Sequence, residues 1–220
     1  MSEPFMFLRI PGLENYPHVT YTWVVMALLL VGTFFARQSI GLIPTGIQNL
    51  FETALVTLAE FMDQTIGHGG RKFMPLIGTL AFFIICGNLM GLIPGFSSPT
   101  ANVNTNFALA LTVAIFYHAV GMRKHGLAYF KQFLGPVWWL IPLMLPIEII
   151  SHLARPITLG VRLFGNVRGE DLVILVLLFL VPLFLPIPMM AFAVFTSVLQ
   201  TLVFILLSMV YLQGALSDEH

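Results

Sequence analysis

A row of polar side chains runs through an otherwise apolar stretch in the C-terminal half of the chain. Its members recur three, four or seven residues apart, which places them on one stripe of a helix: Glu148, His152, Arg155, Arg162 and Asn166. Glu170 and Asp171 follow, and at ~100° per residue an ideal helix turns Asp171 to the side opposite Arg162. Charged groups in such apolar surroundings require water, a protein partner or both. We therefore interpret this stripe as the functional centre of the chain.

These residue types indicate a pathway for protons or other cations. Carboxyl and imidazole groups exchange protons near neutral pH in a suitable environment, so four residues could carry a proton: Glu148, His152, Glu170 and Asp171. Arg162 cannot, because a guanidinium group stays charged in proteins. Its burial in a bilayer would cost at least ~2.5 kcal/mol, which suits an electrostatic gate. The alternative is a static ion pair, in which Glu148 or Asp171 neutralises Arg155 and Arg162 and only fixes helix packing.

The composition requires a membrane. Of 220 residues, 58% are hydrophobic and 9% are charged, and the mean hydropathy is +0.92, which leaves too little polar surface to cover a soluble core. No charged residue occurs from 73 to 122 or from 172 to 217, and each gap exceeds the ~20 residues that one helix needs to cross a bilayer. The net charge of zero, without Lys/Arg-rich runs, gives no footprint for nucleic acid. The sequence shows no metal-ligand cluster, phosphate-binding glycine loop or nucleophile elbow, so no metal, cofactor or catalytic site is expected.

The pattern predicts an all-α integral membrane protein with about five membrane-embedded helices and one interfacial helix, in a single membrane domain over 1–220. Apolar runs predict spans at 19–36, 73–94, 105–122 and 187–212, and the polar stripe belongs to the segment 137–181. The segment 47–66 instead repeats its apolar residues at helical spacing and has an acidic polar face. We expect this amphipathic helix either to lie at the membrane interface or to dock a partner protein.

The segment 137–181 is too long for one upright crossing. Its 45 residues at ~1.5 Å each would reach ~68 Å as a helix, over twice the ~30 Å hydrocarbon thickness, so it crosses twice or forms one strongly tilted helix. Basic side chains gather in two links, after the first and third spans, and short links rich in them stay in the cytoplasm: Arg37, Arg71, Lys72, Arg123, Lys124 and Lys131. This distribution places the N-terminus outside and the C-terminus in the cytoplasm. The charge-free loop 182–188 then favours one tilted helix.

Several short motifs resemble a known protein family. The stretch Pro-Ile-Thr-Leu-Gly-Val-Arg-Leu-Phe-Gly-Asn at 156–166 is followed by Leu-Gln at 199–200 and Tyr-Leu at 211–212, and Asn-Leu-Met-Gly-Leu-Ile-Pro occupies 88–94. Together they resemble subunit a of the F-type rotary ATP synthase in its bacterial form. The likeness covers nearly the whole chain, and the Arg-Leu-Phe-Gly-Asn motif is highly specific for the family.

The resemblance implies a proton-translocating subunit without a catalytic site of its own, in the inner membrane of a bacterium among the other ATP synthase subunits. Its last two helices would lie tilted against a rotating ring of c subunits, and its amphipathic helix would contact the peripheral-stalk subunit b. Arg162 matches the arginine that faces the ring carboxylates and separates two aqueous half-channels. Glu148 would belong to the cytoplasmic half-channel, and Asn166, Asp171 and Gln200 to the outward one. Protons would enter from outside, travel with the ring for nearly a full turn and leave to the cytoplasm, which drives ATP synthesis on other subunits.

The chain departs from the family pattern at Ala193. Some members carry a histidine there, paired with the acidic residue of the outward channel. Asp171 occupies that acidic site here, with Glu170 beside it. The sequence leaves open which of these two carboxyls titrates, and also whether H⁺ or Na⁺ is carried.

Other polar residues carry less weight. His152 and Arg155 are accessory candidates because they share the stripe, whereas Asn88, His118 and His125 lack a charged partner at helical spacing and are interpreted as packing or interface groups. The alternative function is a standalone ion channel or secondary transporter. Such a transporter would normally show paired repeat halves, and the sequence has no convincing internal repeat.

Overall fold

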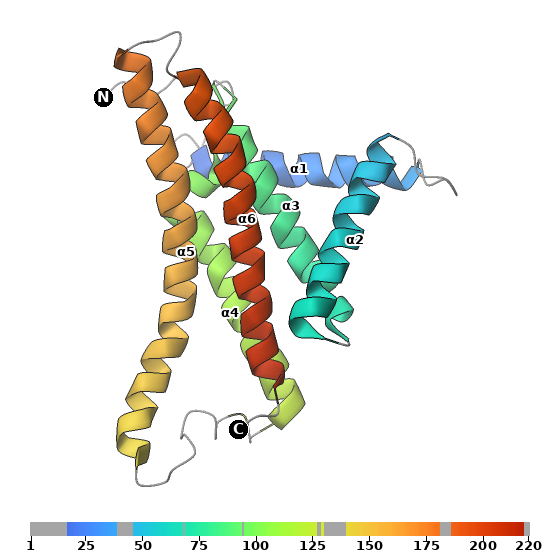
Figure 1. Cartoon of the computed structure of the whole chain (residues 1–220), viewed down its shortest axis with the longest axis vertical. Helices are drawn as coiled ribbons and strands as arrows, with labels where there is room; N and C mark the ends of the chain where they lie inside the picture. The colour runs from blue at the N-terminus through green and yellow to red at the C-terminus, as the bar shows by residue number, and fades with distance from the viewer. Residues whose placement is uncertain are drawn as a thin grey trace.

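The computed structural model describes residues 17–38, 46–67, 69–93, 95–126, 129, 140–180 and 186–217. Within these residues every regular element is helical (Figure 1). In chain order the elements are α1 (Pro17–Gln38), α2 (Ile47–Ile66), the 3₁₀ turn η1 (Gly70–Phe73), α3 (Met74–Gly91), the 3₁₀ turn η2 (Pro99–Ala101), α4 (Val103–His125), α5 (Ile141–Leu180) and α6 (Pro186–Leu216). The all-α fold class predicted from the sequence is confirmed.

Helix α6 is the central element of the bundle. It contacts α2, α3, α4 and α5, and α5 also packs closely against α4. The shared hydrophobic core draws side chains from α2 through α6, among them Met62, Ile77, Val113, Leu163 and Met209. The helix that carries the polar stripe is therefore held from two sides, by α4 and by α6.

Helix α1 runs crosswise to α5 and α6 rather than alongside them (Figure 1). It is attached to α3 by a small second cluster that contains Tyr21, Val25, Phe83 and Met90. The Tyr21 hydroxyl also donates to the carbonyl of Gly95, at 3.4 Å. Helices that cross one another cannot all stand upright in one bilayer, so either α1 or the α5–α6 pair is strongly tilted.

Helix length decides which of them tilts. Helix α1 has 22 residues, α5 has 40 and α6 has 31. At ~1.5 Å per residue these correspond to ~33, ~60 and ~46 Å, against a hydrocarbon thickness of ~30 Å. Helix α1 thus has the length of an upright span, whereas α5 and α6 would need a strong tilt to lie wholly within the hydrocarbon layer.

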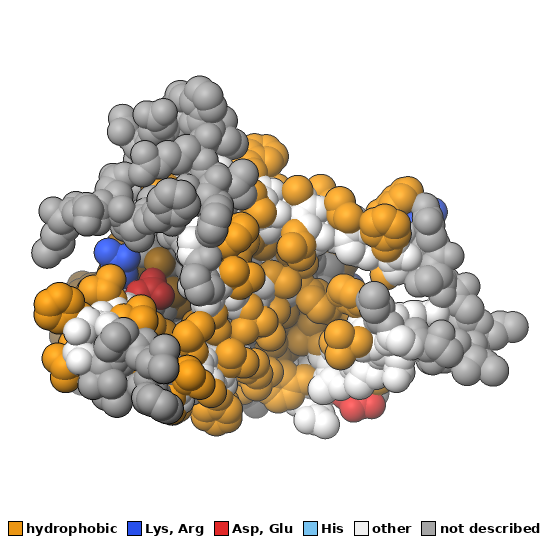
Figure 2. Space-filling view, turned by 90° about the horizontal axis from the view of Figure 1, so that it is seen from above, with side chains coloured by type: hydrophobic (Ala, Val, Ile, Leu, Met, Phe, Trp, Pro, Cys, Tyr) orange, Lys and Arg blue, Asp and Glu red, His pale blue; other side chains and the backbone are white. Residues whose placement is uncertain are grey.

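The described surface is that of a membrane protein. Within the described ranges, four helical stretches are long and apolar enough to cross a bilayer: Pro17–Arg37, Gly70–Gly91, Val103–His125 and Pro186–Leu216. Helix α5 is not among them, and its apolar sequence is interrupted by charged residues. Large hydrophobic side chains are exposed along α1, α5 and α6, and Figure 2 shows a face that is mostly apolar with charged groups confined to small patches.

The segment expected at 137–181 forms one continuous helix in its described part, α5. Residues 137–139 and 181 of the expected segment lie outside the described residues. Pro146 and Pro156 stand inside α5, and each removes one backbone hydrogen bond, yet the helix continues through both. Two crossings would need a break within this segment, and α5 has none between 141 and 180. Helix α2 has the limits expected, and the other helices begin and end within a few residues of the expected segments.

A buried polar network fixes the turn between α3 and α4. The Thr100 hydroxyl donates to Asn88 Oδ1 at 2.5 Å, and the Ser98 hydroxyl donates to the carbonyl of Gly87 at 2.9 Å. Asn102 caps the start of α4, because its side chain accepts a hydrogen bond from the backbone N–H of Asn104 at 2.9 Å. These contacts agree with the interpretation of Asn88 as a packing group.

Candidate functional site

Helix α5 buries one face against the bundle and leaves Arg162 at the edge of that face. The buried positions are His152, Pro156, Leu159, Gly160, Leu163 and Val167. Arg162 lies outside this set and its side chain is exposed. No described residue forms an ion pair with it. A static ion pair that neutralises Arg162 therefore has no support within the described part of the chain.

Helices α5 and α6 run antiparallel in one constant register. Thr196 on α6 lies near the Glu170 carboxyl, and the guanidinium carbon of Arg155 lies 5.4 Å from the ring centre of Tyr211. The fifteen residues that separate Arg155 from Glu170 equal the fifteen that separate Thr196 from Tyr211. Positions on the two helices can therefore be matched level by level along this seam.

Gln200 is level with Asn166 in this register, about one turn beyond Arg162 toward the end of α5. Its side chain is 8% exposed, and its Nε2 has no hydrogen-bond partner among the described residues. Leaving a buried donor unpaired costs about 1–3 kcal/mol. The position therefore favours a water molecule or another polar partner on the α5–α6 seam.

Asn166 and Glu170 form a hydrogen-bonded group next to this level. Asn166 Nδ2 donates to Glu170 Oε1 at 2.7 Å, and Thr196 approaches the same carboxyl from α6. Asp171 is partly buried as well, but its electrostatic neighbours are Arg168 and Glu170. The structure thus joins the predicted residue Asn166 to Glu170 and places Gln200 level with Asn166, whereas Asp171 stands outside this hydrogen-bonded pair.

The position of the missing histidine is filled by packing. Ala193 is fully buried, with 0% exposed, and its carbonyl accepts a hydrogen bond from the Thr196 hydroxyl at 3.1 Å. Thr196 lies one turn beyond Ala193 on α6, and it is the α6 residue near the Glu170 carboxyl.

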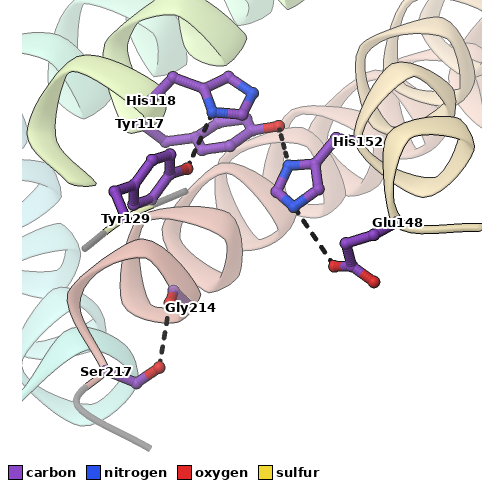
Figure 3. Close-up of polar contacts among 7 residues, drawn as sticks. All are labelled: Tyr117, His118, Tyr129, Glu148, His152, Gly214 and Ser217. Atoms are coloured by element: carbon purple, nitrogen blue, oxygen red, sulfur yellow. Dashed lines mark hydrogen bonds and ion pairs between the residues drawn. The ribbon is translucent and has the colours of Figure 1, made fainter. Parts of the chain in front are cut away.

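A second polar chain lies nearer the start of α5 (Figure 3). His152 Nε2 lies 3.4 Å from Glu148 Oε1, and His152 Nδ1 lies 3.3 Å from the hydroxyl of Tyr117 on α4. The exposed fraction falls along this chain from 32% at Glu148 to 6% at His152 and 1% at Tyr117. A neutral imidazole has one donor and one acceptor nitrogen, so it can serve both neighbours at once. The chain leads from a half-exposed carboxyl into the core.

His118 adds a neighbouring pair to this chain. Its Nδ1 lies 2.8 Å from the Tyr129 hydroxyl, and its ring centre lies 5.1 Å from that of His152. Burial raises the pKa of Tyr129 to about 12, so this phenol keeps its proton at neutral pH. The Tyr129 ring lies so close to Gly121 that a side chain there would collide with it. His118 is held between the Tyr129 hydroxyl and the ring of His152, which agrees with its interpretation as a packing group.

Helical spacing cannot reveal two of the residues that complete these groups. Tyr117 and Thr196 come from α4 and α6, whereas spacing relates only residues of one helix. Only weak indications of these two residues are present in the sequence. Tyr117 stands beside His118 in an otherwise apolar span, and Thr196 lies three residues after Ala193.

The two groups lie on opposite sides of Arg162 along α5. Glu148 is fourteen residues before Arg162 and Glu170 is eight residues after it, which corresponds to ~21 and ~12 Å along a helix. Within the described ranges, no group of three or more His, Cys, Asp or Glu side chains could hold a metal ion. The arrangement supplies proton-exchanging groups at two separate levels, with a fixed cation between them.

The sequence matches the ATP synthase A chain family over residues 19–213. The chain belongs to this family. It is 50% identical to ATP synthase subunit a 1 of Syntrophotalea carbinolica over 234 aligned residues, which cover 100% of both chains. It is 48% identical to ATP synthase subunit a of Trichlorobacter lovleyi over 230 residues, again covering both chains completely. Against ATP synthase subunit a of Geobacter sulfurreducens it is 45% identical over 202 residues, which cover 92% of this chain and 88% of the relative.

Membership of the ATP synthase A chain family confirms the resemblance seen in the motifs. The matched range includes the stretch 156–166 with Arg162, and also both polar groups on α5. The apolar helices and the bacterial relatives together identify a bacterial membrane protein.

Proposed function

We propose that this chain is the proton-translocating subunit of the membrane sector of an F-type ATP synthase. The observation that carries the proposal is Arg162, an exposed cation on a membrane-embedded helix, for which no described residue supplies a counter-charge. A charge in that position requires a partner. Its partner is a series of carboxylates on a rotating ring of c subunits, and the names of the relatives, ATP synthase subunit a, support this reading.

Two half-channels meet the ring on either side of Arg162. Asn166, Glu170 and Gln200 form the outward one, where a proton reaches the ring carboxylate. Glu148 receives the proton on the cytoplasmic side after the ring has turned. Arg162 holds the deprotonated ring carboxylate between the channels and blocks direct transfer, because guanidinium cannot pass a proton on.

Asp171, His152 and Arg155 have supporting roles in this scheme. Asp171 lies beside Glu170 and Arg168, next to the outward group. His152 contacts Glu148, and Arg155 lies against Tyr211 on α6. Each proton driven by ~100 mV contributes ~2.3 kcal/mol, so rotation must pool several protons before ATP is made on other subunits.

The surface for the ring consists of exposed apolar side chains on α5 and α6. On α5 they lie before and after Arg162 in the sequence, among them Val161 and Leu172, and α6 adds others, among them Phe192 and Phe195. A surface of this kind can contact both lipid and the apolar outer face of a helical ring. The chain itself contributes no catalytic site to ATP synthesis in this proposal.

The charge distribution supports an orientation and a second partner. Arg71 and Lys72 in η1 and Arg123 near the end of α4 are exposed, and basic links stay in the cytoplasm, which puts the N-terminus outside and the C-terminus inside the bacterial inner membrane. The acidic face of α2 includes exposed Glu52 and Glu60. This face is the proposed contact for the peripheral-stalk subunit b.

The test is Arg162→Ala in the assembled complex, with ATP-driven proton pumping measured in inverted membrane vesicles. Pumping should fall to background while the c and b subunits still co-purify with the variant. Arg37→Ala, which removes an exposed arginine at the end of α1, is the matched control and should pump normally. Normal pumping by assembled Arg162→Ala complexes would contradict the proposal.

A standalone channel or secondary transporter is the alternative function, and the purified chain alone tests it. The purified chain alone in liposomes should conduct neither H⁺ nor Na⁺, because half of each path belongs to the ring. Ion flux through the isolated chain would favour the alternative. Pumping that requires Na⁺ in the assembled complex would show that the carried ion is Na⁺ rather than H⁺.

A further inference from the structure

A basic pocket opens where the first turn before α3 meets the end of α4. It has a volume of about 820 Å³ and is bordered by η1, α4 and the last residue of α6. Its charged lining residues are Lys72, Arg123 and Lys124, and no acidic residue lines it among the described ones. Its remaining walls are mostly apolar, with Ile66, Phe73, Phe116 and Val120 among them.

We propose that this pocket binds the headgroup of an anionic phospholipid of the surrounding membrane. Lys and Arg side chains donate to phosphate oxygens in charge-assisted hydrogen bonds. The aromatic and aliphatic walls offer contact to the upper part of the acyl chains. The inference rests on the membrane location of the chain and is independent of proton transfer at Arg162.

The pocket lies at the level that a phospholipid headgroup occupies. One apolar stretch begins at Gly70 and the next ends at His125, and the two run in opposite directions, so these ends lie at the same membrane surface. Lys72 and Arg123 stand within two residues of those ends. Cations between helices at the cytoplasmic surface are typical of sites for anionic lipid headgroups.

The neighbouring charges distinguish the pocket from a generally basic surface. Arg71, next to Lys72 in the sequence, is bound to Asp63 at 2.7 Å and does not line the pocket. Lys72 Nζ lies 5.1 Å from the ring centre of Phe73, on the inner wall. Lys124 Nζ donates to the carbonyl of Leu216 at 2.5 Å, so this lysine also holds the end of α6.

The combination of cations and apolar walls in the pocket favours a lipid over a soluble anion. Free phosphate would need only the cations, whereas Phe73 and Phe116 add apolar wall that phosphate cannot use. A rival occupant is the end of the chain itself, because acidic Asp218 and Glu219 follow Ser217 in the sequence. The experiment below separates these three occupants.

The complex is reconstituted in an equal mixture of phosphatidylglycerol and phosphatidylcholine, extracted in mild detergent, and analysed for bound lipid by native mass spectrometry. Phosphatidylglycerol should be retained in preference to phosphatidylcholine. Lys72→Gln with Arg123→Gln should lower this retention about tenfold or more, as expected for two cations near an anionic surface. Lys124 is left in place because of its bond to α6. Arg71→Gln, the matched control, should retain the lipid.

A second variant keeps the test decisive if the charge variant does not assemble. Ala119 is exposed and lines the pocket, so Ala119→Phe narrows the space without changing a charge and should also lower retention. Arg162→Ala, the test of the proposed function, should leave lipid retention unchanged, so the two proposals fail separately.

Four results would overturn the lipid site. The first is unchanged lipid retention in the pocket variants, and the second is an equal loss of lipid retention in Arg71→Gln. The third is displacement of the lipid by millimolar inorganic phosphate. The fourth is a severalfold gain in lipid retention when Asp218→Asn and Glu219→Gln neutralise the chain end. The third result would identify a site for free phosphate. The fourth would identify the acidic chain end as the occupant.

Discussion

The imidazole of His152 lies 3.4 Å from the carboxylate of Glu148, one turn earlier on α5. The contact joins a buried ring to a half-exposed carboxyl. On its other side the ring contacts the hydroxyl of Tyr117 on α4, at 3.3 Å. The proposed cytoplasmic proton acceptor is therefore connected to the bundle core through one imidazole, which makes the roles of Glu148 and His152 separable by mutation.

Glu148→Gln should slow proton release to the cytoplasm. The amide keeps the size of the side chain but cannot take up a proton, and loss of a general acid or base costs about 10²–10⁴-fold in rate. Water in the channel can take over part of the proton transfer. We therefore expect about a tenfold fall in passive proton conduction through vesicles stripped of the catalytic sector. Glu14→Gln, at a position before α1 in the sequence, removes the same charge elsewhere and should conduct normally. Equal conduction by both variants would argue against a role for Glu148.

His152→Gln should conduct better than His152→Leu. Glutamine keeps one donor and one acceptor for Glu148 and Tyr117, whereas leucine keeps only the bulk. A positioning role for His152 also predicts that His152→Leu has little further effect in a Glu148→Gln background, because residues that act as a unit are not additive. Conduction and assembly are measured in the same vesicles. If glutamine and leucine are equally harmful, the imidazole itself carries protons and the positioning role is wrong.

The helices and the stripe could be predicted from the sequence because both depend on local spacing. Apolar runs, the acidic face of α2 and the interval pattern around Arg162 are properties of single helices. The choice between Glu170 and Asp171 could not be made, because it depends on how α5 is rotated against α6. Tyr117 and Thr196 were missed for the same reason, since they join the site across helices.

Glu170→Gln should impair proton entry more than Asp171→Asn. Glu170 accepts a hydrogen bond from Asn166 at 2.7 Å and faces Thr196 on α6, whereas Asp171 has Arg168 beside it. We expect a loss of about tenfold or more in ATP-driven pumping for Glu170→Gln, on the scale of a lost acid–base group. Asp171→Asn should lose only a fraction of its pumping. The reverse order would assign the outward carboxyl to Asp171.

Gly91→Ala should destabilise the turn between α3 and α4. A Cβ atom at Gly91 would lie 2.6 Å from the Cβ of Ser98, and relieving such overpacking costs about 1–3 kcal/mol. Gly32→Ala in α1 is the control, because a Cβ there meets nothing within 4 Å and alanine favours the helix by roughly 0.5–1 kcal/mol. Thermal unfolding of the purified chain should show a lower midpoint for the first variant only. An unchanged midpoint for Gly91→Ala would mean that the turn can open without cost.

Arg162→Lys should fail although it keeps the positive charge. The guanidinium group is planar, stays charged and can bind a carboxylate through two parallel hydrogen bonds, whereas an ammonium is a compact donor that loses its proton more readily when buried. A lysine at this edge of α5 would hold each ring carboxylate less firmly, and its neutral form would let protons pass between the half-channels. We expect ATP-driven pumping to fall at least tenfold, with assembly unchanged and with a proton leak that Arg162→Ala shares. Coupled pumping by Arg162→Lys would show that any cation suffices at this position, and that the shape of the arginine does not matter.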